Sequence, residues 1–290
     1  MKALFIINPK SGIKNSKSML LDAFDVFSNK GYTITTYVTQ SKGDAYNYLS
    51  RNRINADIIC VFGGDGTMFE ITNALMHKRS KPDLAYFPSG TMNDFGSNFN
   101  LGNDFRKIAE KACEKKARYF DVGQFNDQYF NYVAAFGAMC DVPYTTDRSS
   151  KETLGNIAYI LEGISKLPNI KKNTVSYTID NKTYDKDVLF GLIYSGNRVA
   201  GMELSDKSKA KVDDGLFNVL IVDYVPTIFE APNIFSILVE QDKFIHNYHT
   251  DKIILNFKNK KTVWTIDGEE AKSSEKVEIK IHHKALSLLV

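Results

Sequence analysis

Apolar runs alternate with amphipathic stretches along the first third of the chain. The runs ALFIINP, YTITTYV, DIICVF and LAYFP occupy residues 3–9, 32–38, 57–62 and 84–88. The third run lacks polar alternation, which is typical of a central strand covered on both faces of a sheet. Between the runs, apolar spacing predicts a helix that Asn15 caps and that continues through Phe27, followed by a stop at Gly31. A polar helix is expected over Asp44–Arg53. Strands that alternate with helices in this way predict a parallel α/β sheet.

The pattern changes after about Phe125, where longer β-like runs are separated by turn residues. These runs cover residues 129–136, 174–180, 187–195, 216–223 and 252–257. They predict a mostly antiparallel second domain. One amphipathic helix, LGNIAYILEGISKL at residues 154–167, interrupts them, and DNKT at 180–183 is typical of a hairpin turn.

Length and composition are those of a globular protein with two domains. The chain has 290 residues, more than the usual single domain, and its 37 basic and 34 acidic side chains leave a net charge of only +3. This balance argues against a nucleic-acid partner, so any basic surface must be local. The three cysteines, Cys60, Cys113 and Cys140, form no CxxC pair, which favours a reducing cytoplasm over a disulfide framework or a zinc knuckle.

Targeting and membrane-spanning signals are weak. The apolar stretch before Asn8 is too short for a signal-peptide core. The longest apolar region, Leu220–Val239, is interrupted by charged residues and prolines, so we expect no spanning helix.

A glycine-rich turn follows the buried third run, in the stretch VFGGDGTMFEIT at residues 61–72. Glycine permits positive φ and leaves no Cβ in the way, so a bulky anion such as phosphate could approach the backbone there. A helix from about Thr67 would direct its free N–H groups at the same place. Asp65 would then hold a cation or a proton. The alternative is a tight turn in which Asp65 caps the helix.

Two further polar loops follow the first and fourth runs. NPKSG spans Asn8 to Gly12, and PSGTMND spans Pro88 to Asp94. Ligands of open α/β sheets bind beyond the carboxyl ends of the strands, where all three loops must lie. We therefore expect the three loops to converge on a phosphate-rich ligand.

Six motifs in chain order resemble the diacylglycerol-kinase-type lipid kinases. They are NPKSG, GGDGT, PSGTMNDF, DVG at 121–123, VDDGLFNV at 212–219 and IDGE at 266–269. NAD kinases share GGDGT, whereas the other motifs are similar to the lipid-kinase branch. The resemblance implies a Rossmann-like parallel α/β domain at residues 1–125, to which a segment at about 280–290 returns, and a mostly antiparallel β-sandwich domain at 126–280. This chain departs from the family's usual residues at Phe69, Met92 and near Ser208. The departures at Phe69 and Met92 change the expected shape of the nucleotide pocket.

The resemblance also implies the cofactors and their contacts. ATP phosphates would lie against the three loops, and Thr39 after the second run matches a further nucleotide contact. The nucleotide-binding residues expected are Asn8, Pro9, Lys10, Ser11, Gly12, Thr39, Gly63, Gly64, Asp65, Gly66, Thr67, Gly90, Thr91 and Asn93.

Two magnesium sites are expected from the same resemblance. Asp65, Asp94 and Asp121 would form a carboxylate and water network at a catalytic Mg²⁺, consistent with that ion's preference for oxygen ligands. A structural Mg²⁺ would bind the Asp214 side chain and the carbonyls of Lys211 and Leu216. DDG is also a common turn, which is the alternative for that segment.

Glu269 in IDGE is the catalytic base that the family resemblance implies. In the competing interpretation Asp65 is the base and Glu269 a positioning group, and a plain hairpin turn at 267–269 is the third option. His246 and His249 are spaced three apart without an acidic or cysteine partner pattern, so solvent-facing side chains are expected rather than a metal site.

The function expected is ATP-dependent phosphorylation of a lipid hydroxyl, most simply that of diacylglycerol, by a cytoplasmic protein that associates peripherally with membranes. An NAD kinase, a kinase of another sphingoid or glycerolipid, and a nucleotide-binding regulator are the alternatives. A homodimer is left open. The basic stretch at residues 105–118 is either a solvated face or a contact for anionic lipids.

Overall fold

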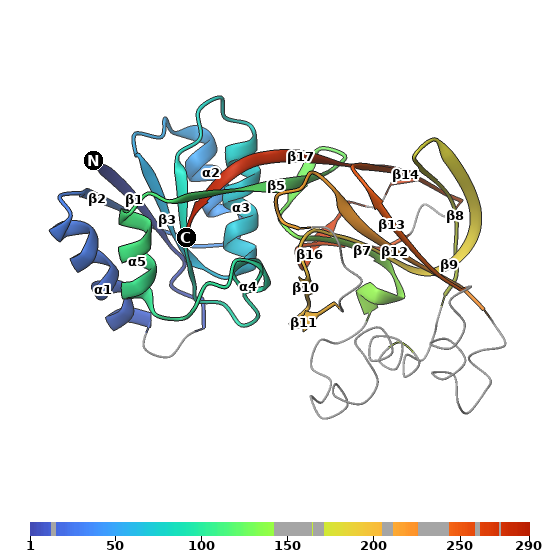
Figure 1. Ribbon diagram of the computed structural model, residues 1–290, viewed down its shortest axis with the longest axis horizontal. Helices are drawn as coiled ribbons and strands as arrows, with labels where there is room; N and C mark the ends of the chain where they lie inside the picture. The colour runs from blue at the N-terminus through green and yellow to red at the C-terminus, as the bar shows by residue number, and fades with distance from the viewer. Residues whose placement is uncertain are drawn as a thin grey trace. The chain divides into compact units, whose positions relative to one another are not determined.

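Two compact units make up the protein, whose computed structural model is drawn in Figure 1. Unit 1 contains residues 1–122, 128–131 and 282–290, and unit 2 contains residues 123–127 and 132–281. The structure describes residues 1–12, 16–141, 164, 171–204, 211–225, 244–258, 262–272 and 274–290. Of the helix predicted at 154–167, only Ile164 is described, and it is helical and buried.

Unit 1 contains a parallel sheet with strand order β2-β1-β3-β4-β17. Its strands are β1 (Lys2–Ile7), β2 (Thr33–Val38), β3 (Ile58–Gly63), β4 (Asp83–Pro88) and the last part of β17 (Lys276–Leu289). The end of β17 lies parallel to β4, with Leu288 opposite Leu84. The predicted parallel α/β architecture is confirmed.

Five helices flank this sheet in the described part of unit 1 (Figure 1): α1 (Ser16–Asn29), α2 (Asp44–Arg51), α3 (Asp65–Met76), α4 (Asp94–Asn98) and α5 (Phe105–Cys113). Helix α1 ends close to the predicted point, and Gly31 after it has a φ of 77°. The predicted cap, Asn15, lies outside the described residues.

The core of unit 1 is aromatic and lies between the sheet and the α1–α5 pair. Phe5, Phe62 and Phe87 come from three adjacent strands, and the rings of Phe62 and Phe87 stack with centroids 4.1 Å apart. Strand β3 is buried along its whole length, as its uniform apolar run predicts. Burying each of these rings contributes about 1.5–3 kcal/mol, so β3 is a firm support for the loop that follows it.

Unit 2 is built on antiparallel ladders, as predicted. Strand β9 (Lys182–Tyr194) pairs with β7 (Val133–Gly137), β8 (Asn173–Ile179) and β12 (Phe217–Asp223). The remaining pairs connect β8 to β14 (Lys252–Phe257), β14 to β17, β12 to β13 (Ile245–Thr250), and β15 (Trp264–Ile266) to both β7 and β16 (Glu269–Ala271). Strands β10 (Arg198–Val199) and β11 (Met202–Glu203) form a separate short pair, and a 3-10 helix, η1, covers Ala138–Asp141.

Two predictions for the second half of the chain, the hairpin turn at 180–183 and the strand at 129–136, can be compared with the structure. The hairpin turn predicted at DNKT is present, because β8 ends at Ile179 and β9 begins at Lys182, with Asp180 and Asn181 at positive φ. The run at 129–136 is not one strand. It divides into β6 (Gln128–Phe130), which pairs with β5 (Ala117–Phe125), and β7.

Candidate active site

The three polar loops of unit 1 contact one another at the carboxyl edge of the parallel sheet. Asn8 after β1 donates from Nδ2 to Thr67 Oγ1, 3.1 Å away, in the turn after β3. Ser11 Oγ lies 2.7 Å from Ser89 Oγ in the loop after β4. The backbone amide of Ser89 donates to the carbonyl of Gly63 over 2.9 Å. Side chains and backbone together therefore hold the loops in one cluster, as their positions after parallel strands predict.

Glycines allow two of these loops to approach each other closely. A Cβ on Gly90 would lie 2.5 Å from the Cα of Gly64, and one on Gly64 would lie 3.0 Å from the Cα of Gly90. A Cβ on Gly63 would collide with the Thr67 side chain. None of the three has a positive φ, so the left-handed backbone that glycine permits is not adopted here. Gly64 and Gly90 are required by the close contact between their two backbones, and Gly63 by the side chain of Thr67.

The loop after β4 is closed by the side chain of Asn93, which adopts a left-handed conformation with φ 54°. Its Oδ1 accepts from the amide of Gly90 at 2.9 Å, and its Nδ2 donates to the Gly90 carbonyl at 2.9 Å. Asparagine tolerates this backbone better than most residues because its short amide can bond locally. This closure fixes the neighbours Thr91 and Met92, whose side chains are exposed.

Asp65 connects the turn after β3 to the start of α4. Its two carboxylate oxygens accept from the amides of Asp94 and Phe95, each at 3.1 Å. Asp65 therefore caps α4 and makes no side-chain capping bond to α3, the helix in which it lies. The capping role expected in the alternative interpretation is present, but it serves another helix.

The ionised form of Asp65 is disfavoured in the folded protein. Burial raises the pKa of this carboxyl to about 6, with a further increase from the nearby Asp94 carboxylate, against the lowering effect of the amides that bond it. Burial, followed by the charges of Asp65 and Asp94, also raises the pKa of the Tyr86 phenol. Two acidic groups so close together favour a bound proton or cation.

Asp65, Asp94 and Asp121 form no direct cluster of three among the described residues, and their predicted carboxylate and water network at a catalytic Mg²⁺ stays a prediction. Asp94 is 2% exposed beside Asp65. Asp121 in β5 instead accepts from the Lys284 amide at 2.7 Å and lies 2.9 Å from Nδ1 of His283, both in β17. Among the described residues no three His, Cys, Asp or Glu side chains lie close enough together to hold a metal. Asp121 thus connects β5 to a part of β17 more than 160 positions later in the chain.

The other residues predicted to bind the nucleotide lie around the same loops. Pro9, Lys10 and Gly12 are exposed, and the Lys10 amide donates to Asn8 Oδ1 at 3.0 Å. Gly66 lies in the first turn of α3. Thr39 is buried, and its amide and hydroxyl both donate to the carbonyl of Ile7 at the end of β1.

Glu70 has a role that the sequence analysis missed. Its carboxylate accepts from the amides of Gly43 at 2.7 Å and Ala45 at 3.0 Å, so it caps α2 from a position in α3. The neighbouring Phe69, where the family usually has asparagine, is half-buried in α3. Sequence spacing carries no signal for a cap that comes from another helix 27 residues away.

The segment predicted to hold a structural Mg²⁺ forms a closed turn in unit 2. The Asp214 carboxylate accepts from the amides of Lys211 at 2.8 Å and Leu216 at 3.1 Å, and Gly215 has a φ of 80°. These bonds are those of the turn given as the alternative. The magnesium site at these three residues stays a prediction.

IDGE forms a two-residue hairpin between β15 and β16. Asp267 and Gly268 both have positive φ, and Ile266 lies opposite Glu269. Asp267 Oδ1 also accepts from the amides of Tyr132 and Val133, at 3.0 and 3.1 Å, which ties the hairpin to β7. Glu269 is half-buried at the first position of β16. The hairpin given as an alternative for residues 267–269 is present. The bonds from Asp267 to β7 hold the backbone next to Glu269 in a fixed position within unit 2.

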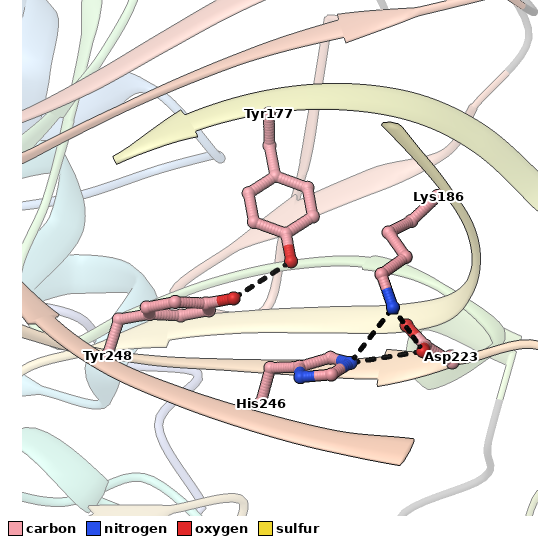
Figure 2. Close-up of polar contacts among 5 residues, drawn as sticks. All are labelled: Tyr177, Lys186, Asp223, His246 and Tyr248. Carbon is pink, nitrogen blue, oxygen red and sulfur yellow. Dashed lines mark hydrogen bonds and ion pairs between the residues drawn. The ribbon is translucent and has the colours of Figure 1, made fainter. Parts of the chain in front are cut away.

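One of the two spaced histidines is not solvent-facing. His246 in β13 lies 3.0 Å from Asp223 Oδ2, which also accepts from Lys186 Nζ at 2.8 Å (Figure 2). The second oxygen of Asp223 is buried and has no hydrogen-bond partner among the residues that the structure describes. Beside this group the hydroxyls of Tyr177 and Tyr248 are 3.0 Å apart, and burial raises the pKa of Tyr177. Lys186 and Asp223 are sequence-distant partners of His246 that its local spacing could not reveal.

Known proteins match this chain in sequence and in fold. Residues 2–125 match the diacylglycerol kinase catalytic domain. A diacylglycerol kinase of Staphylococcus saprophyticus is 32% identical over 77% of this chain and 73% of its own length, and one of Staphylococcus aureus is 33% identical over 77% and 70%. The chain therefore belongs to the diacylglycerol kinase family.

Solved structures agree with this membership. A crystal structure of a diacylglycerol kinase from Bacillus anthracis str. Sterne is 25% identical, covers 99% of this chain and 96% of its own, and has a TM-score of 0.77. Yeast NADH kinase in complex with NADH shares the fold at 10% identity and a TM-score of 0.54, covering 99% of this chain and 82% of its own. The two-part fold class that the motifs imply is confirmed.

Proposed function

We propose that this protein transfers the γ-phosphate of ATP to the hydroxyl of diacylglycerol, forming phosphatidic acid and ADP. The observation that carries the proposal is the interlocked set of loops after β1, β3 and β4, in a chain of the diacylglycerol kinase family. Phosphoryl transfer needs neutralised phosphates, an aligned acceptor and a destination for the hydroxyl proton.

The loops supply the phosphate cradle. Helix α3 has 12 residues and begins at Asp65, so its first amides lack acceptors within the helix and carry its positive dipole end. Phosphate oxygens are suitable acceptors for such amides. Asn8, Ser11 and Thr67, which are already joined by the contacts between the loops, would orient the phosphates.

Asp65 and Asp94 fit a Mg²⁺ ion that accompanies ATP. Their carboxylate oxygens are of the kind that Mg²⁺ prefers. Burial, and then the neighbouring Asp94 carboxylate, raise the pKa of Asp65, and a bound cation would offset both effects. Mg²⁺ would supply neutralisation of the phosphate charge there. We also propose that Lys211, Asp214 and Leu216 hold a second, structural Mg²⁺.

Glu269 is the base in this proposal. As the O–P bond forms and the γ-phosphate leaves ADP, the hydroxyl proton passes to the Glu269 carboxylate and then to solvent. The alternative assigns this step to Asp65, whose pKa of about 6 also suits proton exchange near neutral pH.

The test is transfer of label from [γ-³²P]ATP in the presence of magnesium, with diacylglycerol, a sphingoid base, a total lipid extract or NAD as acceptor. Label in the organic phase with diacylglycerol supports the proposal. Label only with another lipid would change the acceptor and keep the chemistry. Label in NADP would show that the protein phosphorylates NAD instead. No label with any acceptor would favour a nucleotide-binding regulator.

A further inference from the structure

A polar cleft of about 700 Å³ opens in unit 1 between the segments that precede β3 and β4. We call it the amino-edge cleft. It is lined by Arg51, Asn52, Arg53, Ile54, Ala56, Asp57, Lys78, Arg79, Ser80, Lys81, Pro82 and Asp83.

The amino-edge cleft is separate from the proposed ATP site. Its lining ends where β3 and β4 begin, at Ile58 and Asp83, whereas the loops of the candidate active site follow the ends of the same strands. A strand of six residues spans roughly 20 Å. A ligand in this cleft would therefore be distinct from one at the carboxyl edge.

Charge in the cleft is strongly unbalanced. Five lining side chains are basic and two are acidic. Both acidic groups already accept hydrogen bonds, Asp57 from the Lys2 amide at 2.8 Å and Asp83 from the Ser287 hydroxyl. The cleft therefore has an excess of positive charge, and its two carboxylates already accept hydrogen bonds from other residues.

Two of the five cations have structural partners. Lys78 Nζ donates to the carbonyls of Ser50 and Asn52, at 2.9 and 3.3 Å, where α2 ends. Lys81 Nζ donates to the carbonyl of Ala285 in β17 at 3.3 Å, and burial lowers the pKa of this lysine. These two lysines connect the wall of the cleft to the end of α2 and to β17, so their charges have a structural role.

The other three cations in the cleft are arginines. Arg51, Arg53 and Arg79 are exposed in the cleft and make no side-chain hydrogen bond or ion pair with any residue that the structure describes. Cations near helix C-termini are often explained by the helix dipole, which fits Arg51 at the end of α2. Arg53 lies beyond that helix, and Lys78 already binds the terminal carbonyls. The dipole therefore does not account for the whole set.

We propose that the amino-edge cleft binds a phosphate-bearing anion through Arg51, Arg53 and Arg79. Guanidinium groups keep their charge at all physiological pH values and present paired N–H donors that match phosphate oxygens. This inference stands on the cleft and does not depend on the proposed kinase activity. The phosphate could belong to a lipid headgroup or to a soluble polyphosphate.

The test compares the full-length parent with Arg53→Gln/Arg79→Gln. The control is Lys182→Gln/Lys272→Gln, which removes the same charge from two exposed lysines of unit 2. Binding is measured to inorganic tripolyphosphate by calorimetry, and to phosphatidylcholine vesicles with and without phosphatidate by co-sedimentation. Thermal melts of all three proteins check the fold, and we expect them to agree because the two arginines are exposed and make no side-chain hydrogen bond or ion pair with a described residue.

The cleft variant is expected to bind at least one probe about tenfold more weakly than the parent, the size of one lost charged hydrogen bond, while the control stays within about twofold. Loss only with tripolyphosphate identifies a soluble ligand, loss only with phosphatidate vesicles identifies a headgroup, and loss with both identifies the phosphate group itself. Equal binding of the cleft variant and the parent to both probes would overturn the proposal. Equal weakening by the control would overturn it too, because net charge alone would then explain the effect.

Discussion

Asp65 illustrates how one residue can serve both structure and chemistry. It holds the start of α4 through two amides and still has a carboxyl pKa of about 6. Between the ordinary aspartate pKa of about 3.9 and this value, the folded protein keeps a proton that the unfolded chain has released. The contribution of Asp65 to the free energy of unfolding must therefore decrease as pH rises through that interval.

This sign gives a pH prediction for Asp65→Asn. Relative to the variant, the parent should be more stable at about pH 4 than at about pH 7, since asparagine has no charge to be penalised. Urea unfolding of both proteins at the two pH values measures the difference. If the stability gap between parent and variant is the same at both, Asp65 does not have a raised pKa.

Glu269 is tested against its neighbour in the same hairpin. Glu269→Gln should lower kcat by roughly 10²–10⁴ with little change in ATP affinity, because the amide cannot accept the proton. Glu270→Gln removes the same charge from the exposed next position of β16 and should leave kcat within about twofold. Steady-state kinetics and ATP titration separate the effects. A selective loss of ATP binding in Glu269→Gln would make Glu269 a nucleotide contact rather than a base.

At the scale of elements, the junction of the loops after β3 and β4 depends on the absence of two side chains. Gly90→Ala places a methyl group 2.5 Å from the Cα of Gly64 and 2.9 Å from Asn93 Oδ1. We expect a loss of about 1–3 kcal/mol in the free energy of unfolding, since the obstruction is backbone that cannot rotate away. ATP affinity should fall as well, because the two loops must separate.

Gly102→Ala is the matched control for Gly90→Ala. A Cβ there has no atom within 4 Å and its φ is not positive, so stability and ATP binding should both be retained. Denaturant unfolding and calorimetric ATP titration on the two variants suffice. Equal stability and ATP affinity in Gly90→Ala and the parent would show that the close approach of the loops is not required.

In this protein the local pattern of apolar and polar residues predicts the strands of unit 1 and the positions where they end. The uniform apolar run of β3 indicates a central strand, and small polar residues after β1, β3 and β4 indicate loops at one sheet edge. Contacts between distant positions carry no such signal. The Glu70 cap on α2, the Asp121 contact with His283 and the Asp223 pairing with His246 all depend on tertiary neighbours, so periodicity could not reveal them.

Motif order supplies what periodicity lacks, within limits. The glycines of GGDGT and PSGTMND mark the loop junction. For GGDGT, the sequence indicates glycine because it permits positive φ and leaves no Cβ in the way of an anion. The structure shows close contact between Gly64 and Gly90 at ordinary φ values. A motif can therefore identify a site from sequence while leaving the physical cause of each residue to the coordinates.

At the scale of the whole molecule, a lipid kinase must reach a substrate that stays in the bilayer. Each CH₂ brought from the membrane into water costs about 0.8 kcal/mol, so the protein must approach the surface rather than extract the lipid. No helix among the described residues is long and apolar enough to cross a membrane. With a net charge of only +3, the membrane attachment that the proposed function requires would rely on local basic groups.

Ion pairs in the structure reduce the number of basic groups that are available in the stretch 105–118. Arg106 pairs with Asp22 and Asp25, Lys107 with Asp104, and Lys116 with Glu114. Lys111 and Lys115 have no such pair among the described residues and are exposed. This surface should therefore attract anionic headgroups more weakly than its six basic residues suggest.

Membrane attachment should accordingly be weak, reversible and electrostatic. Each free lysine near an anionic surface contributes about 1 kcal/mol, and the attraction is confined to a Debye length of about 8 Å at physiological salt. Co-sedimentation should increase from phosphatidylcholine to phosphatidylglycerol vesicles, decrease as salt rises, and fall about tenfold or more in Lys111→Gln/Lys115→Gln. Lys182→Gln/Lys272→Gln removes the same charge elsewhere and should pellet like the parent if the effect is local. Equal pelleting on neutral and anionic vesicles at all salt concentrations would contradict electrostatic attachment.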